Sequence, residues 1–331
     1  MFTEFEQQLV NALQINPRAS WTDLGEILQV DPVTVARHWT ALESSGRSWI
    51  NVDAGDQVPT GPWLTVFATL DCVTGYVHAI AERLADEGLV FGIDHISGRS
   101  DLLVSIAIPD LATLSDYLMV DLAGVDGVRH VNVFVTTKIV RQGHHWRVRA
   151  LSPDQEHQVR VTLPAAGTAR PLGASDEPLL GAVLSNPRVS YTVLAQAMGV
   201  SASTARRRLN ALLAAGQLTM RCEIAQSLSG WPVSTLIRCH VRPARLSAAM
   251  HQLAGLPEAR LCASVTGTDA NLLLGAWLRS VADLERLEYA LHDQVDDLRV
   301  VDRALVLRHV KRAGRVLDRQ GRPIRRVPIR W

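Results

Sequence analysis

Apolar residues recur at helical spacing in three short segments within the first 50 residues. In the third segment Val35, Trp39 and Leu42 lie at positions i, i+4 and i+7, which places them on one face of a helix. Ser20 precedes the second segment and Asp31 precedes the third, and both residue types favour the position that caps a helix N-terminus. The pattern predicts three short helices joined by tight turns, which is a helix-turn-helix.

After residue 60 the pattern changes to short alternating or β-branched runs, which predict strands. Helical spacing returns between the first and second runs and again between the third and fourth. The resulting order is β-α-β-β-α-β, the ferredoxin-like arrangement. The four predicted strands are 64–70, 90–96, 102–108 and 128–135.

The whole pattern occurs twice. The tripeptide Asn-Pro-Arg at 16–18 recurs 170 residues further on at 186–188, and residues 16–46 align with 186–216 without a gap. Twelve of these 31 positions are identical, where chance gives about two. The second ferredoxin-like set is predicted at 233–241, 244–254, 259–266, 272–277, 281–293 and 298–310.

These observations predict an α+β fold, in which two winged/helix-turn-helix domains alternate with two ferredoxin-like domains. Residues around Ser152-Pro153-Asp154 are expected to form a short hairpin before a linker, and Asp318 to Gly321 a turn near the C-terminus. The predicted segments are helix-turn-helix domains at 1–54 and 176–226, ferredoxin-like domains at 62–143 and 231–313, a hairpin and linker at 144–175, and a basic tail at 314–331.

Composition narrows the protein class. No apolar run reaches the 18 or so residues of a membrane span, and the segment Met1–Glu6 is acidic rather than a secretion signal. The four cysteines are far apart and form no metal-ligand or disulfide pattern. We expect a cytoplasmic protein with no membrane association, no structural metal and no cofactor.

Charge is uneven along the chain. Arg308 to Trp331 holds nine Lys or Arg and one acid, Asp318. Residues 1–50 hold three basic and six acidic residues, whereas residues 176–225 hold five basic and three acidic. The second helix-turn-helix and the tail are therefore the segments best suited to a polyanion.

The third helix of a helix-turn-helix enters the major groove of DNA, where Arg bonds to guanine or phosphate and hydroxyl groups suit phosphate oxygens. The alternative is that these polar residues are only a solvated helix face. We expect duplex DNA as the partner, with the second copy binding it more strongly. The candidate DNA-binding residues are Thr34, Arg37, His38, Ser201, Ser203, Thr204, Arg206, Arg207 and Arg208.

The chain resembles the Lrp/AsnC (feast/famine) transcription regulators. The resemblance rests on a helix-turn-helix ending in LxxxG, at 42–46 and 212–216, and on a following β-α-β-β-α-β module with a glycine loop after its second strand. It covers most of the chain twice and implies a tandem-duplicated member. It also implies that the ferredoxin-like modules are effector domains, which pair through their sheets and bind an amino acid or similar small metabolite near that loop.

Carried over by position, the effector loops differ between the copies. A carboxylate in the loop suits an α-amino group and backbone N–H groups suit a carboxylate; the alternative is a tight turn without a ligand. The second copy departs from the family pattern through one extra residue and Asn271. The candidate effector-binding residues are Gly98, Arg99, Ser100, Asp101, Gly267, Thr268, Asp269 and Asn271.

The family forms dimers through its effector modules. Here the two copies can pair within one chain, or copies from different chains can pair, and either leaves room for a homo-oligomer such as a dimer or tetramer.

The sequence thus favours a non-enzymatic, sequence-specific DNA-binding transcriptional regulator that responds to a small metabolite. One alternative is a tetrapyrrole-binding enzyme like the sirohaem decarboxylases, which share this architecture; the eleven histidines, however, show no metal-ligand spacing. Another is a sensing or assembly protein that has lost DNA binding. The histidines of interest are His130, His144, His145, His240 and His309.

Overall fold

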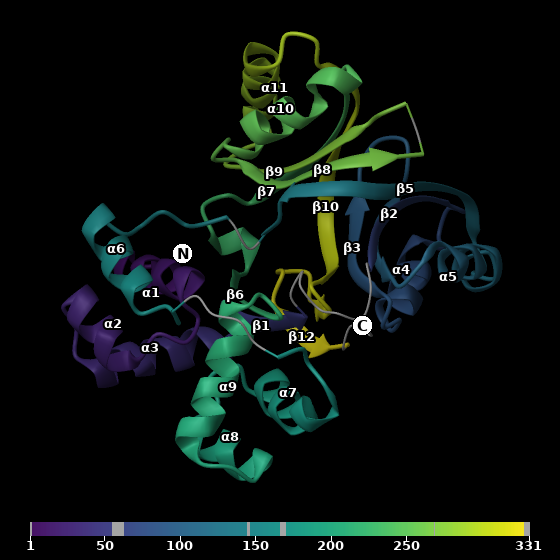
Figure 1. The fold of residues 1–331 in the computed structure, drawn as a ribbon. Helices are drawn as coiled ribbons and strands as arrows, with labels where there is room; N and C mark the ends of the chain where they lie inside the picture. Colours follow the sequence, from purple (N-terminus) through teal and green to yellow (C-terminus); the bar gives the residue numbers. More distant parts are fainter. Residues whose placement is uncertain (1, 55–62, 144–145, 166–169, 268, 328–331) are drawn as a thin grey trace. The chain divides into compact units, whose positions relative to one another are not determined.

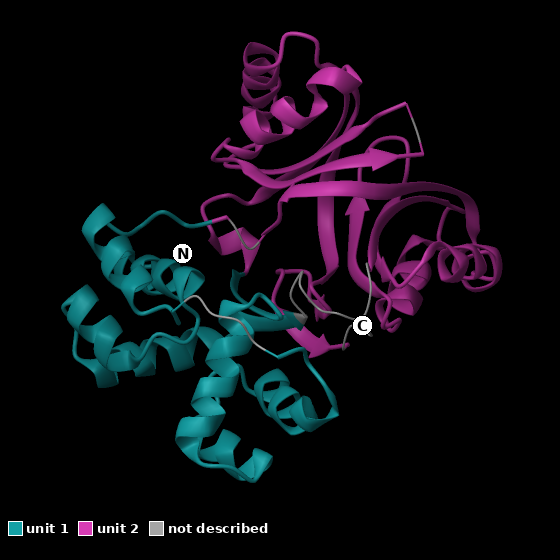
Figure 2. Ribbon diagram, in the orientation of Figure 1, with its two compact units in different colours: residues 1–61, 147–224 teal, residues 62–146, 225–331 magenta. Residues whose placement is uncertain are grey.

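The computed structural model describes residues 2–54, 63–143, 146–165, 170–267 and 269–327. The chain folds as two compact units, shown in different colours in Figure 2: unit 1 is Met1–Gly61 with Arg147–Ile224, and unit 2 is Pro62–Trp146 with Ala225–Trp331. Each unit therefore combines a segment from each half of the chain. Among the described residues, no helix has the length and apolar character needed to cross a membrane.

Unit 1 contains two sets of three helices, each followed by a strand (Figure 1). From the second helix of each set onward, matching elements begin 170 residues apart, so the duplication seen in the sequence extends to the secondary structure. The elements are α1 (Glu4–Ile15), α2 (Trp21–Leu28), α3 (Pro32–Ser44), β1 (Ser48–Ala54), α6 (Pro153–Val161), α7 (Glu177–Ser185), α8 (Tyr191–Met198), α9 (Ala202–Ala214) and β6 (Leu218–Ile224).

Side-chain caps fix where these helices begin. Ser20 accepts a hydrogen bond from the backbone N–H of Asp23 at the start of α2, at 3.0 Å. Asp31 does the same at the start of α3, where Pro32 takes the first helical position. Ser201 caps α9 in the equivalent place. The predicted helix-turn-helix geometry is present in both copies.

Strands β1 and β6 pair with each other and relate the two copies by approximate twofold symmetry. They run antiparallel, with Ser48 opposite Ile224 and Ala54 opposite Leu218. At the centre of this register lies the pair Asn51 and Arg221, two residues that are equivalent in the duplication. The approximate twofold axis therefore passes between equivalent residues of a single chain.

The prediction of a hairpin around Ser152-Pro153-Asp154 is wrong. These residues begin helix α6, because Ser152 and Gln155 form a capping box with backbone bonds of 3.2 and 3.0 Å. A proline at the first helical position favours a helix rather than a turn when a Ser cap and a Gln three residues later surround it. Helix α6 packs against α1 and α2 of the same unit and buries Val159 completely.

Unit 2 contains two β-α-β-β-α-β sets, and the strands predicted from the sequence are present in both. In the first set, α5 continues into a π-helical segment over Tyr117–Leu122. The elements are β2 (Leu64–Cys72), α4 (Val77–Ala85), β3 (Val90–Ile96), β4 (Leu102–Ile108), α5 (Leu111–Asp116), β5 (Val128–Arg141), β7 (Val233–His240), α10 (Pro243–Ala254), β8 (Ala259–Thr266), β9 (Leu272–Leu278), α11 (Asp283–Gln294), β10 (Arg299–Arg312), β11 (Arg315–Leu317) and β12 (Pro323–Arg326).

The two sets of strands close into one antiparallel ring. Within the first set the strand order is β5-β2-β4-β3, and within the second it is β10-β7-β9-β8. The sets join where β5 pairs with β8 and where β10 pairs with β3. Each copy therefore completes the sheet edges of the other, so these edges are not open for pairing with another chain.

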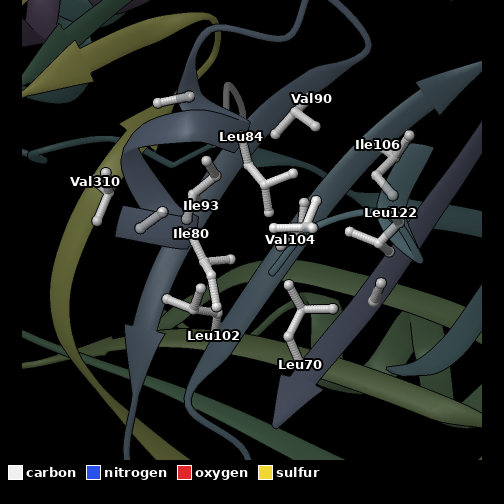
Figure 3. Close-up of a cluster of buried hydrophobic side chains, with 14 of the residues drawn as sticks. Leu70, Ile80, Leu84, Val90, Ile93, Leu102, Val104, Ile106, Leu122 and Val310 are labelled. Carbon is white, nitrogen blue, oxygen red and sulfur yellow. The ribbon is translucent and has the colours of Figure 1, made fainter. Parts of the chain in front are cut away.

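Among the described residues, three apolar clusters stabilise unit 2. One lies inside the ring and takes residues from both copies, including Phe67, Phe134 and Leu273. The other two lie between each sheet and its own helices. Figure 3 shows the first of these, where Ile80 and Leu84 of α4 lie among side chains of β3 and β4. Burying one such aliphatic side chain contributes about 1.5 to 3 kcal/mol.

The C-terminal segment folds onto this sheet. Strand β11 pairs with β10, and β11 pairs with β12 through the turn that the sequence places between Asp318 and Gly321. The backbone N–H of Asp318 donates to the carbonyl oxygen of Arg322 at 2.8 Å, and Gly321 takes a φ of 78°, which favours glycine. Up to Val327 the basic tail is thus a hairpin rather than an extended arm.

Candidate functional site

Helices α3 and α9 each bury one face and expose the other. The stripe Val35, Trp39 and Leu42 of α3 is buried, as the spacing predicts. Leu209 and Leu212 take the equivalent places in α9. Trp39 is therefore a core residue.

On α3, the predicted DNA-binding residues differ in how accessible they are. Arg37 is exposed, and Thr34 is half-buried at the first turn. The ring of His38 packs edge-on against the ring of Phe5 in α1, with 5.0 Å between ring centroids. His38 therefore connects α3 to α1 and leaves Arg37 as the accessible cation of this helix.

On α9, the exposed polar residues lie at its N-terminal end. Ser203, Arg206 and Arg207 are exposed, and the Arg206 guanidinium lies 5.9 Å from the ring centroid of Tyr191. The hydroxyl of Ser201, which caps the helix, lies 3.0 Å from the hydroxyl of Thr204. Hydroxyl groups and two cations thus gather at the end of the helix that enters the groove in helix-turn-helix proteins.

Arg208 is not an accessible cation, contrary to the prediction from sequence. Its guanidinium donates to both carboxylate oxygens of Asp176 at 2.8 and 2.7 Å, and to the backbone oxygen of Arg170 at 3.0 Å. Asp176 is fully buried, and the hydrogen bond from Arg208 holds the pKa of its carboxyl below the ordinary value. Arg208 fastens α9 to the start of α7, which is the task that His38 performs in the first copy.

The repeated Asn-Pro-Arg motif holds the two helix-turn-helix sets together. Arg18 donates to the backbone oxygens of Pro187 and Val189 at 2.6 and 2.8 Å. Arg188 donates to the equivalent two oxygens of the first copy at 2.5 and 2.6 Å, and lies 3.7 Å over the ring of Trp21. Burial lowers the pKa of Arg188 to about 10. The sequence showed this motif as a repeat, but its reciprocal role needs the fold.

The first effector loop borders a small pocket in unit 2. Gly98 takes a φ of 97°, which turns the chain after β3. Arg99 and Ser100, two of the candidate effector-binding residues, line the pocket, and the opposite wall comes from the second copy. The enclosed space is small, with room for about one water molecule, and its mouth opens to solvent. Its lining residues are Thr69, Ile96, Ser97, Arg99, Ser100, Leu236, Arg238, Asp302 and Ala304.

Sequence reasoning missed the charged pair of this pocket. Arg238 of β7 forms an ion pair with Asp302 of β10, which lies directly opposite it in the sheet. The equivalent positions in the first copy hold the neutral pair Thr69 and Asn132. The alignment of the two copies could have shown this pair, because a charged pair in the second copy aligns with a neutral pair in the first.

Asp101, predicted to meet a ligand amino group, is instead bound to the backbone. Its carboxylate accepts from the N–H of Cys72 at 2.7 Å. Asn271, its equivalent, accepts from the N–H of Val241 at 3.0 Å and donates to the carbonyl oxygen of the same residue at 2.7 Å. In both copies a side-chain oxygen accepts a backbone N–H at the end of the first strand of the set, and an acid or an amide can supply that oxygen.

The second effector loop makes contacts of its own. A Cβ on Gly267 would lie against the carbonyl oxygen of Val133, so only glycine fits at this point. The backbone oxygen of Asp269 lies 3.1 Å from Nδ1 of His240. Thr268, a further candidate, lies outside the described residues.

Of the histidines of interest, His309 and His130 contact neighbouring side chains. Nδ1 of His309 lies 2.5 Å from the carboxylate of Asp94, and its Nε2 lies 2.6 Å from Oε1 of Gln226. His130 lies 3.2 Å from the side-chain oxygen of Asn132. His144 and His145 lie outside the described residues. No group of three His, Cys, Asp or Glu in the described part of the chain is arranged to hold a metal ion.

Comparison with known proteins matches both kinds of module. Residues 65–145 match the Lrp/AsnC ligand binding domain, and residues 175–219 match a winged helix-turn-helix DNA-binding domain. An uncharacterized HTH-type transcriptional regulator of Pyrococcus abyssi is 25% identical over 140 residues, which cover 42% of this chain and 87% of that protein. A similar regulator of Pyrococcus horikoshii is 23% identical over 141 residues, covering 43% and 89%.

Among solved structures, the siroheme decarboxylase NirDL has a similar fold over the length of the chain. The TM-score is 0.60 at 12% identity, with 94% of this chain and 93% of that one covered. This likeness concerns the fold alone. The chain therefore carries an Lrp/AsnC ligand-binding domain and a winged helix-turn-helix domain of the DNA-binding type.

Proposed function

We propose that this protein is a sequence-specific DNA-binding transcription regulator, a tandem-duplicated form of the Lrp/AsnC regulators in which two helix-turn-helix domains alternate with two effector domains. The observation that carries the proposal is the presence, in one compact unit, of two helix-turn-helix sets whose third helices expose an arginine at the same position, Arg37 and Arg207. An arginine there can form two hydrogen bonds with guanine in the major groove. The location proposed for such a regulator is the cytoplasm.

The direct test is the binding of the full chain to duplexes selected from a genomic library, measured by fluorescence anisotropy at fixed salt. Replacing Arg37 and Arg207 together by Ala should weaken specific binding at least tenfold, since each lost guanine contact reduces discrimination by about 1 to 3 kcal/mol. Arg160→Ala is the control, because Arg160 is an exposed cation on α6, a helix that packs against α1 and α2. Equal losses in the control and the double variant would contradict the proposal.

The small molecule is proposed to bind beside Arg99 and Ser100, against the ion pair of Arg238 and Asp302. A ligand with both a carboxylate and an ammonium group, such as an amino acid, has the charges to match this pair. Because the equivalent pair in the other copy is neutral, we propose that the two loops do not take the same ligand. A thermal-shift screen of amino acids should find stabilising ligands for the wild type and none for Arg238→Gln.

The second candidate function is sirohaem decarboxylation, favoured by the whole-chain likeness to NirDL. The contacts of His309 with Asp94 and Gln226 count against it, since both ring nitrogens are already occupied. Incubation with an iron tetrapyrrole distinguishes the two. A Soret band retained after gel filtration, together with loss of carboxyl groups from the tetrapyrrole, would favour the enzyme over the regulator.

A further inference from the structure

The two third helices belong to one chain but are not alike. On the basis of the proposed function, we infer that a single chain reads an asymmetric operator in one fixed orientation, with α3 on one half-site and α9 on the other. A regulator built from identical subunits cannot select one orientation, because its two recognition helices, here called readers, are the same. The inference therefore goes beyond DNA binding to the direction in which the protein lies on its site.

The first support is that the pair of readers is assembled inside the chain. Strands β1 and β6 pair about the equivalent residues Asn51 and Arg221. Arg18 and Arg188 each donate two hydrogen bonds to backbone oxygens of the other copy. These contacts lie within unit 1, so every chain presents one α3 and one α9.

The second support is the part that the two helices share. Thr34 and Thr204 are half-buried at equivalent places in the first turn, and Arg37 and Arg207 are exposed one turn later. A shared arginine predicts a shared guanine in each half-site. The operator should therefore contain an inverted repeat at these positions, as expected for two readers related by a twofold axis.

The third support is the part in which they differ. Val33 of α3 is 75% exposed, and the equivalent residue of α9 is Ser203, also exposed. An exposed apolar side chain at this end of a recognition helix suits the methyl group of thymine, whereas a hydroxyl does not require one. Arg206, an added cation, takes the place that Ala36 has in α3. We therefore expect thymine beside the guanine in the α3 half-site, and a further guanine or phosphate contact in the α9 half-site.

Positions 38 and 208, which are equivalent in the two copies, do not add to this difference. His38 packs on Phe5, and Arg208 is bonded to buried Asp176, so both side chains hold their helix in place. The asymmetry thus rests on positions 33 and 36 of the first copy and on 203 and 206 of the second.

The test begins with selection of tight-binding duplexes from a random pool by the full chain. From the selected sequence three duplexes of equal length are made: the selected site, a palindrome of its first half and a palindrome of its second half. Each mismatched base pair weakens binding roughly 5- to 150-fold, so the selected site should bind at least about fivefold more tightly than either palindrome. A palindrome that binds as tightly as the selected site would overturn the inference.

The orientation is tested with single variants. Arg37→Ala should remove chemical protection of guanine from one half-site, and Arg207→Ala from the other. The double variant Val33→Ser with Ala36→Arg makes α3 like α9 and should move the preference to one of the two palindromes. Circular dichroism checks that each variant is folded, and Arg160→Ala again serves as the charge control.

The outcomes separate the two levels of the proposal. If the pool yields no preferred duplex, the proposed function fails. If it yields a preferred duplex that is a perfect palindrome, or if both single variants lose protection at the same half-site, DNA binding stands and the directional inference fails.

Discussion

Arg208 offers a sharp test of the site, because the sequence and the structure predict opposite roles for its side chain. As an arginine of a recognition helix it would contribute to DNA affinity. In the structure its side chain is 11% exposed and is bonded to a carboxylate that is fully buried. We expect Arg208→Met to lower the free energy of unfolding of unit 1 and to leave the exposed side chains of Ser203, Arg206 and Arg207 in place.

The magnitude follows from the partners that remain. Removing one member of a buried ion pair typically costs 3 to 5 kcal/mol, because the other charge is left without compensation. Here Arg170 still donates to both oxygens of Asp176 at 3.1 and 3.0 Å, although its side chain is 55% exposed. The expected loss is therefore at the lower end, about 3 kcal/mol. Arg207→Met, at the exposed neighbouring position, should change stability by less than about 0.5 kcal/mol.

Urea unfolding followed by circular dichroism, with hydrogen exchange at the amides of α7 and α9, measures both variants. The carboxyl of Asp176 has a lowered pKa in the folded chain, so its contribution is complete above the unfolded value near 3.9 and is lost as pH falls through the folded value. The difference between wild type and Arg208→Met should thus be constant from pH 7 to pH 5 and shrink in stronger acid. A stable Arg208→Met that loses specific DNA binding would refute the reasoning.

Three further outcomes are expected. Gly267→Ala should lower the melting temperature, with a cost of about 1 to 3 kcal/mol, because the new Cβ meets the backbone oxygen of Val133 at a φ of 107°; Gly173→Ala, with open space around it, is the control. Burial lowers the pKa of Lys311 to about 8, so the unfolded chain binds the extra proton between that pH and its ordinary value. Stability should therefore rise with pH over this interval, and Lys311→Met should abolish the rise. Arg188→Ala, which removes two hydrogen bonds to buried backbone oxygens, should speed hydrogen exchange in β1 and β6. Unchanged exchange would contradict the role of Arg188 in holding the two copies together.

Local pattern predicted the elements well, for a physical reason. Short runs of apolar and β-branched residues predict strands and a spacing of 3.6 residues predicts helices, so β3, β4 and α3 were visible in the sequence. Helix α6 was missed because Ser-Pro-Asp was interpreted as a turn, although Gln155 completes a capping box. That signal was present and local, and it outweighs the tendency of proline to mark turns.

The contacts that assign roles to side chains were beyond the sequence. Nothing local distinguishes Arg207, which faces solvent, from Arg208, which is bonded to Asp176 across 32 residues. The same holds for Asp101, whose partner is the N–H of Cys72 on another strand. The pairing of β5 with β8, which joins the two copies, also depends on the full fold. The sequence left open whether the two ferredoxin-like copies pair within one chain or between chains. In the structure they pair within one chain.

The measurement that tests the central claim most directly is the affinity of the full chain for a selected duplex and for its scrambled counterpart, over a range of salt concentrations. Recognition through α3 and α9 predicts a preference of at least about 10³ for the selected duplex at physiological salt, with both affinities falling as salt rises. Equal affinity for the two duplexes at every salt concentration would contradict the account.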